Sequence, residues 1–152
     1  MPLACVGLAP GQPEYRVLIV DDRVEDRSVL RRILEHAGFR VHAAETGESG
    51  IEMFKVWRPH FIWVDRRLPA MDGLTATRCI RAMDGGSDLK IVGLSASVFV
   101  SERAEMLAAG LDDFLRKPYL PREILDCMAQ HLGVRYKYAE SAVNSARDAP
   151  DQ

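Results

Sequence analysis

Short apolar segments alternate with stretches of helical spacing along most of the chain, and this alternation restricts the possible folds more than any single motif does. The apolar segments are rich in β-branched and aromatic residues and predict strands at 16–20, 40–44, 60–64, 89–94 and 111–115. Most of them are continuously apolar, which is typical of strands buried on both faces. Strands that alternate strictly with helices predict a parallel sheet with helices on both sides.

The predicted helices are marked by apolar residues three and four positions apart and by residues that stop helices. Gly38, Pro59 and Gly85 stand where the first three helices should end. The apolar stripes cover 30–37, 51–57, 74–83, 104–108 and 124–132. Because five strand–helix units are too few for a closed eight-stranded barrel, we expect an α/β fold. It should be an open, doubly wound sheet of five parallel strands in the order 2-1-3-4-5, with five helices.

Composition adds a few limits. The 152 residues, 47% hydrophobic and 28% charged, are typical of one globular domain, and the formal net charge of −2 gives no reason to expect binding to nucleic acid or to a membrane. No apolar run has the length of a membrane span, and the amino-terminal residues lack the features of a secretory signal. Cys5, Cys79 and Cys127 are widely spaced and form no CxxC or Cys/His ligand pattern, so we expect a protein of the reducing cytoplasm.

The two ends of the chain differ from its middle. Proline recurs without a periodic pattern near the amino terminus, and residues 139–152 are small and polar, so neither end is expected to fold alone. We predict a linker or tail at 1–15, one domain at 16–133 and a carboxyl-terminal tail at 134–152.

Five polar side chains come at the ends of predicted strands. Asp21 and Asp22 follow the first strand, Asp65 the third, Ser95 the fourth and Lys117 the fifth. Because the carboxyl ends of parallel strands share one edge, and the first and third strands are predicted neighbours, the three acids should converge. Acids so placed repel one another. A hard divalent cation, Mg²⁺ above all, is the natural group to offset them, with Lys117 as a second positive charge.

Two other interpretations of these acids compete with a metal site. A single aspartate after a strand often serves a turn or a helix start, and Asp22 or Asp26 is well placed to favour the first helix. A doubly wound domain can also bind a flavin or a nucleotide, but phosphate-binding loops are rich in glycine, serine and threonine. The first loop here is DDRVED, which would repel a phosphate unless a metal intervened.

These motifs together resemble response-regulator receiver domains, in which an aspartate accepts a phosphoryl group from a phosphohistidine on a partner protein. The resemblance runs from about residue 16 to residue 133. The segments that carry it are VLIVDD (17–22), VDRRLPAMDG (64–73), LSA (94–96) and AAGLDDFLRKP (108–118), in this order and at these spacings. It implies a flavodoxin-like fold and a signalling role that depends on Mg²⁺.

The resemblance also implies a role for each site residue. Asp65 would be the phosphoacceptor, and Ser95 and Lys117 would bind the phosphoryl oxygens. The peptide bond between Lys117 and Pro118 would be cis. The implied magnesium ligands are Asp21, Asp22, Asp65 and the backbone carbonyl of Arg67.

Phosphorylation is expected to act as a switch. Ser95 would move towards the phosphoryl oxygens, and Phe114, at the family's aromatic switch position, would turn inward and reshape the face of the fourth helix, fifth strand and fifth helix. The run Val98-Phe99-Val100 would add a partner-binding patch there, or else pack onto the core. Arg66 and Arg67 would either protect the phosphoryl group from water or simply face solvent.

Three classes of function follow. The leading one is a phosphorelay switch, monomeric or weakly dimeric and not itself a turnover enzyme, that accepts a phosphoryl group from a histidine kinase or histidine phosphotransfer protein and signals to a downstream protein. The alternatives are a receiver-like interaction module without phosphotransfer and a Mg²⁺-dependent phosphatase with Asp65 as its nucleophile. The segment HLGVRYKYAE (131–140) resembles the exit from receivers of hybrid sensor histidine kinases, so we expect either an excised part of such a kinase or a stand-alone regulator.

Overall fold

A five-stranded parallel sheet forms the centre of the computed structural model, which describes residues 5–96 and 100–138. Its strands lie in the order β3-β2-β4-β5-β6, and this order confirms the predicted topology. Their bounds are β2 Arg16–Val20, β3 Arg40–Ala44, β4 Phe61–Asp65, β5 Lys90–Ser95 and β6 Asp113–Arg116. The register sets Val20 of β2 beside Val64 of β4, so the two strands end side by side.

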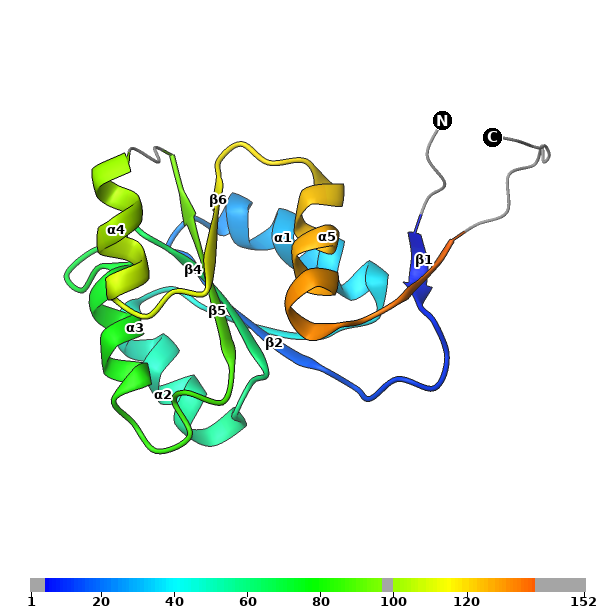
Figure 1. Ribbon diagram of the computed structural model, residues 1–152, viewed down its shortest axis with the longest axis horizontal. Coiled ribbons are helices and arrows are strands. Elements are labelled where there is room, and N and C mark those ends of the chain that lie inside the picture. The colour runs from blue at the N-terminus through cyan, green and yellow to red at the C-terminus, as the bar shows by residue number, and fades with distance from the viewer. Residues whose placement is uncertain (1–4, 97–99, 139–152) are drawn as a thin grey trace.

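The helices within the described ranges cover both faces of the sheet (Figure 1). On one face lie α1 (Val24–Ala37) and α5 (Pro121–Leu132). On the other lie α2 (Gly47–Trp57), α3 (Gly73–Arg81) and α4 (Val100–Ala108). This two-sided cover leaves the carboxyl ends of the strands at one edge of the molecule, the upper edge in Figure 1.

A hydrophobic core fills the space on each side of the sheet. Leu30 of α1 and Ile124 of α5 pack with Trp63 on one side, and Phe54 of α2 packs with Ile62 on the other. Neighbouring residues of β4 therefore point into opposite cores, as the pleat of a strand requires. All five residues of β4 are buried, so the strand gives the acid at its end a rigid base.

Local signals determine where the helices begin and end. α1 ends at Gly38, whose φ of 109° lies in the left-handed region that glycine adopts readily. α3 begins after Asp72, whose carboxylate accepts a hydrogen bond from the backbone N–H of Thr75 at 2.8 Å. The N–H of Gly73 donates to the carbonyl of Arg66 at 2.9 Å, which sets the start of α3 against the end of β4.

A two-stranded antiparallel sheet, the terminal ribbon, joins the two ends of the described chain at the right of Figure 1. It consists of β1 (Cys5–Leu8) and β7 (Tyr136–Tyr138) and pairs Leu8 with Tyr136. The hydroxyl of Tyr136 donates to the carbonyl of Leu125 in α5 at 2.6 Å. The ribbon is thereby attached to the core on the side of α1 and α5.

Neither strand of the ribbon is predicted from the sequence, which indicates a linker at 1–15 and a tail at 134–152. The ribbon shows that parts of both segments have regular structure. The division of the chain into linker, domain and tail otherwise stays a prediction.

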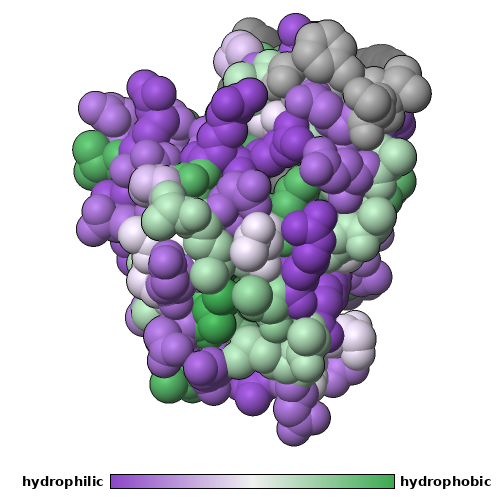
Figure 2. All heavy atoms as spheres, turned by 90° about the vertical axis from the view of Figure 1, so that its left-hand side faces the viewer, coloured by the Kyte–Doolittle hydropathy of each residue, from purple (hydrophilic) through white to green (hydrophobic). Residues whose placement is uncertain are grey.

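The outer side of α3 and α4 is mainly hydrophilic, with a strip of apolar side chains between the polar ones (Figure 2). Within the described ranges, none of the helices combines the length and the apolar character needed to cross a membrane. The proposed patch at Val98-Phe99-Val100 lies outside the residues whose side chains are described.

Candidate functional site

Three aspartates meet at the carboxyl edge of the sheet. One carboxylate oxygen from each of Asp21, Asp22 and Asp65 lies within 4.8 Å of those of the other two. Asp21 is 1% exposed and Asp65 is 7% exposed, whereas Asp22 faces solvent. The cluster is therefore buried on the side of the sheet and open towards solvent at Asp22.

The ammonium group of Lys117 binds three carboxylates at once. Its Nζ donates to Oδ2 of Asp21 at 3.0 Å, to Oδ2 of Asp26 at 2.9 Å and to Oδ2 of Asp65 at 3.1 Å. An ammonium group carries three protons, so these bonds use its full capacity as a donor. Asp26 is not among the predicted site residues, because it lies in the first turn of α1, where the sequence indicates only an acid that favours the helix.

The two buried acids are held in the same way at the ends of neighbouring strands. Oδ1 of Asp21 accepts a hydrogen bond from the backbone N–H of Arg23, and Oδ1 of Asp65 accepts one from the N–H of Arg67, both at 3.0 Å. The second oxygen of each acid accepts from Lys117. Each carboxylate is thus fixed between the following backbone and one shared cation.

Two pKa values at this edge are raised, that of Asp21 by burial and that of Lys117 by its acidic partners. Burial raises the pKa of Asp21, although hydrogen bonds from Arg23 and Lys117 act in the opposite direction. Burial also favours the neutral form of Lys117, but hydrogen bonds to Asp26 and Asp21 outweigh that effect, together with the negative charge of Asp65, and its pKa is raised. Lys117 is therefore a cation at neutral pH, and a further cation at this edge would favour the ionised form of Asp21.

The other predicted side chains flank the cluster. Ser95 is 3% exposed at the end of β5, and its backbone carbonyl accepts a hydrogen bond from the N–H of Lys117 at 2.8 Å. Phe114 of β6 is half-buried against the core beneath α4, with the guanidinium carbon of Arg103 5.2 Å from its ring centre. The peptide bond between Lys117 and Pro118 is cis.

Arg66, the residue after Asp65, connects the end of β4 to α4. Its guanidinium donates to Glu102 and to Glu105, each at 2.7 Å. The side chains of Arg66 and Glu102 are 18% and 20% exposed, so this pair is partly shielded from solvent. Neither role predicted for Arg66 describes this contact, because the sequence does not reveal that α4 places both acids opposite it.

The donor atoms at the edge suit a hard divalent cation. Mg²⁺ prefers oxygen ligands, retains several waters and is usually held by one or two carboxylates. Asp21, Asp22 and Asp65 offer carboxylate oxygens close together, and the exposed position of Asp22 leaves room for a hydrated ion. The role of the backbone carbonyl of Arg67 as a further ligand of Mg²⁺ stays a prediction.

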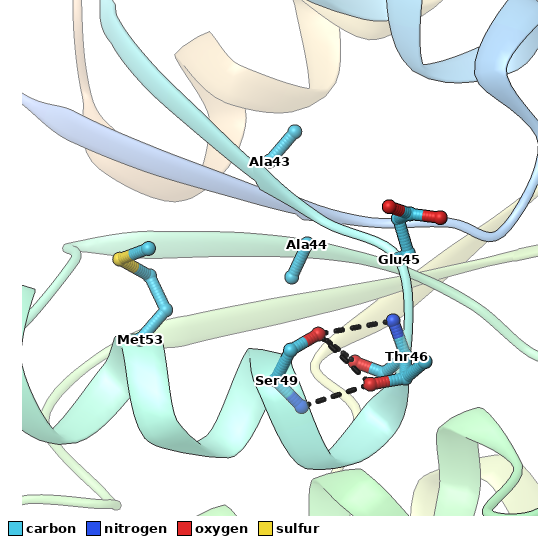
Figure 3. A pocket seen from close by; sticks show the side chains of 6 residues that line it. All are labelled: Ala43, Ala44, Glu45, Thr46, Ser49 and Met53. Carbon is cyan, nitrogen blue, oxygen red and sulfur yellow. Dashed lines mark hydrogen bonds between the residues drawn. The ribbon is translucent and has the colours of Figure 1, made fainter.

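A separate hollow lies beside the carboxyl end of β3 (Figure 3). It is lined by Ala43, Ala44, Glu45, Thr46, Ser49 and Met53. The hydroxyls of Thr46 and Ser49 bond to each other at 2.9 Å and to the backbone at the start of α2. These groups serve as the cap of that helix, and the hollow contains none of the predicted site residues.

The sequence resembles those of known signalling proteins. A family model described as "Response regulator receiver domain" matches residues 17–129. "Response regulator MprA" of Mycobacterium ulcerans is 41% identical over 110 residues, which are 72% of this chain and 47% of that protein. The corresponding protein of Mycobacterium avium is 40% identical over the same shares. The chain thus spans about half the length of the curated relatives it matches.

Solved structures show the same fold. The receiver domain of sensor histidine kinase PA1611 from Pseudomonas aeruginosa, described as having a magnesium ion coordinated in its active site cleft, is 30% identical with a TM-score of 0.74. The match covers 80% of this chain and 99% of that one. Chemotaxis protein CheY4 of Vibrio cholerae, 24% identical with a TM-score of 0.76 over 78% of this chain and 99% of that one, supports the fold alone.

Proposed function

Because the chain belongs to the response regulator receiver domains of two-component systems, we propose that Asp65 accepts a phosphoryl group from a phosphohistidine of a partner protein. The observation that carries this proposal is the contact between Lys117 and Oδ2 of Asp65 at 3.1 Å, at the end of a fully buried strand. A positioned carboxylate beside a fixed cation is what phosphoryl transfer requires, since this reaction depends mainly on alignment and charge stabilisation.

A carboxylate oxygen of Asp65 forms a bond to phosphorus while the bond between phosphorus and the histidine nitrogen breaks. The nitrogen keeps the electron pair, and one proton from solvent makes the leaving group a neutral imidazole. Lys117 pairs with a phosphoryl oxygen instead of Oδ2 of Asp65, and the hydroxyl of Ser95 donates to another. Mg²⁺, held by Asp21, Asp22 and Asp65, would supply further positive charge to the phosphoryl oxygens.

The surroundings of Lys117 support a protein as the donor. The side chains of Val24, Val29 and Leu120 are 58%, 49% and 52% exposed. Val29 lines a hollow together with Asp26, Lys117, Pro118 and Tyr119. Exposed apolar side chains next to a charged site are typical of a surface that binds another protein. We propose that the histidine-bearing partner, a histidine kinase or a histidine phosphotransfer protein, binds there.

Incubation with acetyl phosphate and Mg²⁺ should add one phosphoryl group to each chain, measured by intact mass. Asp65→Asn should remove the adduct, because an amide oxygen cannot act as the nucleophile. A chelator should suppress the adduct in the unchanged chain, because the carboxylates would then repel the incoming phosphate. A phosphorylated histidine phosphotransfer domain should likewise lose its phosphoryl group to the unchanged chain and keep it in the presence of Asp65→Asn.

Asp88→Asn, a substitution of an exposed acid in the turn before β5, serves as the control and should leave the adduct intact. An adduct that persists in Asp65→Asn would contradict the assignment of the acceptor. Continuous release of phosphate from esters without an adduct would support the phosphatase alternative. Absence of both would support a module that only binds partners.

We also propose that phosphorylation changes α4 and β6 through Arg66 as well as through Ser95 and Phe114. A phosphoryl group on Asp65 brings negative charge next to Arg66, where it competes with Glu102 and Glu105 for the guanidinium. A weaker tie to α4 would free this helix to shift as Phe114 turns inward. The face of α4, β6 and α5 is the proposed binding surface for a downstream protein.

Amide exchange measured by mass spectrometry should become about fivefold faster across residues 102–108 after phosphorylation, as expected when ion pairs worth about 1 kcal/mol are lost. Arg66→Met should produce the same change without phosphorylation. Lys55→Met, which removes a surface ion pair of α2, is the control and should leave exchange in α4 unchanged. Equal exchange across 102–119 in both phosphorylation states would rule out the switch.

The wider context of the chain is also a proposal. The likeness to the receiver of a sensor histidine kinase supports a hybrid kinase as the parent protein, and the likeness to about half of a response regulator supports a separate regulator. We propose a cytoplasmic, monomeric or weakly dimeric switch without turnover of its own.

A further inference from the structure

A second cluster of metal-binding side chains lies between β6 and α5, on the face of the sheet covered by α1 and α5. Asp113, Cys127 and His131 each offer one ligand atom, and these atoms lie within 4.8 Å of one another. Nε2 of His131 is 3.0 Å from Oδ2 of Asp113. Cys127 is 5% exposed, and the His131 and Asp113 side chains are 12% and 34% exposed. The cluster is therefore mostly buried but open to solvent on one side.

The fold rather than the sequence brings these donors together. Cys127 and His131 are four residues apart on α5, so they project from one face of the helix. Asp113 stands at the start of β6, and the register places it beside Val92, which is in turn beside Trp63. Asp113 thus lies in the row of the sheet that faces α5. The sequence shows the Cys127–His131 pair at helical spacing, but the third donor lies on another element, so the fold alone completes the set.

Two of the donors are already oriented. Oδ1 of Asp113 accepts a hydrogen bond from the backbone N–H of Phe114 at 2.8 Å, which leaves Oδ2 directed at His131. The ring of His131 packs edge-on against Phe61, with the ring centres 6.4 Å apart. Orienting contacts of this kind are what tune the ligands of metal sites in proteins.

We infer that Asp113, Cys127 and His131 form a binding site for Zn²⁺, with a water as the fourth ligand. A thiolate, an imidazole and a carboxylate are the ligands that Zn²⁺ takes in proteins, and sites with three protein ligands keep one position open. Ligands on one tetrahedral Zn²⁺ stand roughly 3–4 Å apart, so the side chains have to move by about 1 Å or less. The carboxylate oxygens around Lys117 suit Mg²⁺ instead, so the two sites would select different cations.

Binding has to displace a proton from Cys127. Burial, together with the charge of Asp113, raises the pKa of this thiol to about 12, so without a cation it is protonated at neutral pH. The sulfur forms a bond to zinc as the thiol proton leaves to solvent. Nε2 of His131 gives up the proton that it shares with Asp113, which moves to Nδ1 or to solvent, before it binds the ion. The positive charge of the ion then offsets both the thiolate and Asp113.

The inference is tested by titrating the full chain with Co²⁺ and recording visible and near-ultraviolet absorption. Excess Mg²⁺ is present so that the site of Asp21, Asp22 and Asp65 is occupied. One equivalent should produce a thiolate-to-cobalt charge-transfer band together with the intense d–d bands of tetrahedral cobalt. One equivalent of Zn²⁺ should abolish both. The acids around Lys117 include no sulfur, so a thiolate band cannot arise from that site.

Cys127→Ser and His131→Gln should each lower the affinity for Zn²⁺ by at least about 100-fold. Loss of a residue that only supports a metal ligand typically costs less than that. The double variant Cys5→Ser/Cys79→Ser leaves Cys127 as the remaining cysteine of the chain and should keep the band. Loss of the thiolate-to-cobalt band in the double variant would overturn the inference, and so would its persistence in Cys127→Ser. Absence of this band in the unchanged chain would overturn it as well. Since His131 is partly exposed, His131→Gln should fold even if Cys127→Ser does not, and circular dichroism verifies this.

Discussion

Lys117→Met is expected to slow phosphorylation of Asp65 by acetyl phosphate by at least about 100-fold, as removal of a charge-stabilising donor does in other active sites. It should also lower the free energy of unfolding in the absence of Mg²⁺ by roughly 3 kcal/mol, the lower end of the range for breaking a buried ion pair. The lower end applies because Lys117 is 19% exposed and Asp26 37% exposed. Without the ammonium group, Asp21 and Asp65 would face each other with no shared cation.

Mg²⁺ should recover part of the stability lost in Lys117→Met. A divalent cation that binds the folded chain raises its free energy of unfolding, and the variant no longer has an ammonium group competing for the same carboxylates. Urea unfolding in increasing MgCl₂, at constant ionic strength, should therefore show a larger gain for the variant than for the unchanged chain. Lys55→Met removes an exposed pair with Glu52 and should change stability by less than about 0.5 kcal/mol. Equal responses to Mg²⁺ in both chains would contradict the assignment of these acids to one cation site.

Gly73→Ala is expected to destabilise the fold by about 3 kcal/mol and to slow phosphorylation of Asp65. A methyl group at this position would stand 2.2 Å from the carbonyl oxygen of Asp65 and 3.0 Å from Cα of Arg66. Both are backbone atoms, so relief requires the start of α3 or the end of β4 to move, and overpacking of this kind costs about 1–3 kcal/mol or more. Any movement of β4 displaces the acceptor from Lys117, and small displacements of reacting groups reduce rates strongly.

Thermal unfolding and the rate of adduct formation measure the two effects of Gly73→Ala. Gly47→Ala is the matched control, because Gly47 also opens a helix, but a methyl group there would meet the side chain of Met71 at 3.0 Å and its backbone oxygen at 3.1 Å. These contacts are relieved by shifts of a few tenths of an ångström, unlike the contact at Gly73. The control should lose less than a third as much stability as Gly73→Ala and should be phosphorylated at the normal rate. If Gly73→Ala retained full stability and rate, the close contact between α3 and β4 would have no part in positioning Asp65.

The sequence predicts the sheet well because its signals are local. Most predicted strands are short apolar runs bounded by turn residues, and their alternation with helices predicts a parallel, doubly wound sheet. The order 2-1-3-4-5 is one of the common orders of such sheets. The convergence of Asp21, Asp65 and Lys117 follows from that order, since all three stand at strand ends. The bounds of the fifth strand of the parallel sheet are less well predicted, because the pattern indicates 111–115 whereas β6 covers Asp113–Arg116.

Features that depend on contacts between distant parts of the chain are not predictable in this way. Asp26 reaches Lys117 from within α1, and nothing in its own surroundings distinguishes it from an acid that favours a helix start. Arg66 finds its partners on α4, and Cys127 shares its cluster with a residue of β6. Each contact depends on how a helix lies on the sheet, which spacing along the chain does not specify.

The terminal ribbon determines which part of the domain opens first when force is applied to the ends of the described chain. Its strands are antiparallel, and the outer ends of the described chain, residues 5 and 138, are paired with each other. A force applied to these two ends would break the hydrogen bonds of the ribbon one after another, in unzipping geometry. In shear geometry the bonds would instead bear the force together. The ribbon would thus open at low force, and the parallel sheet that carries Asp65 would stay unstrained until it had done so.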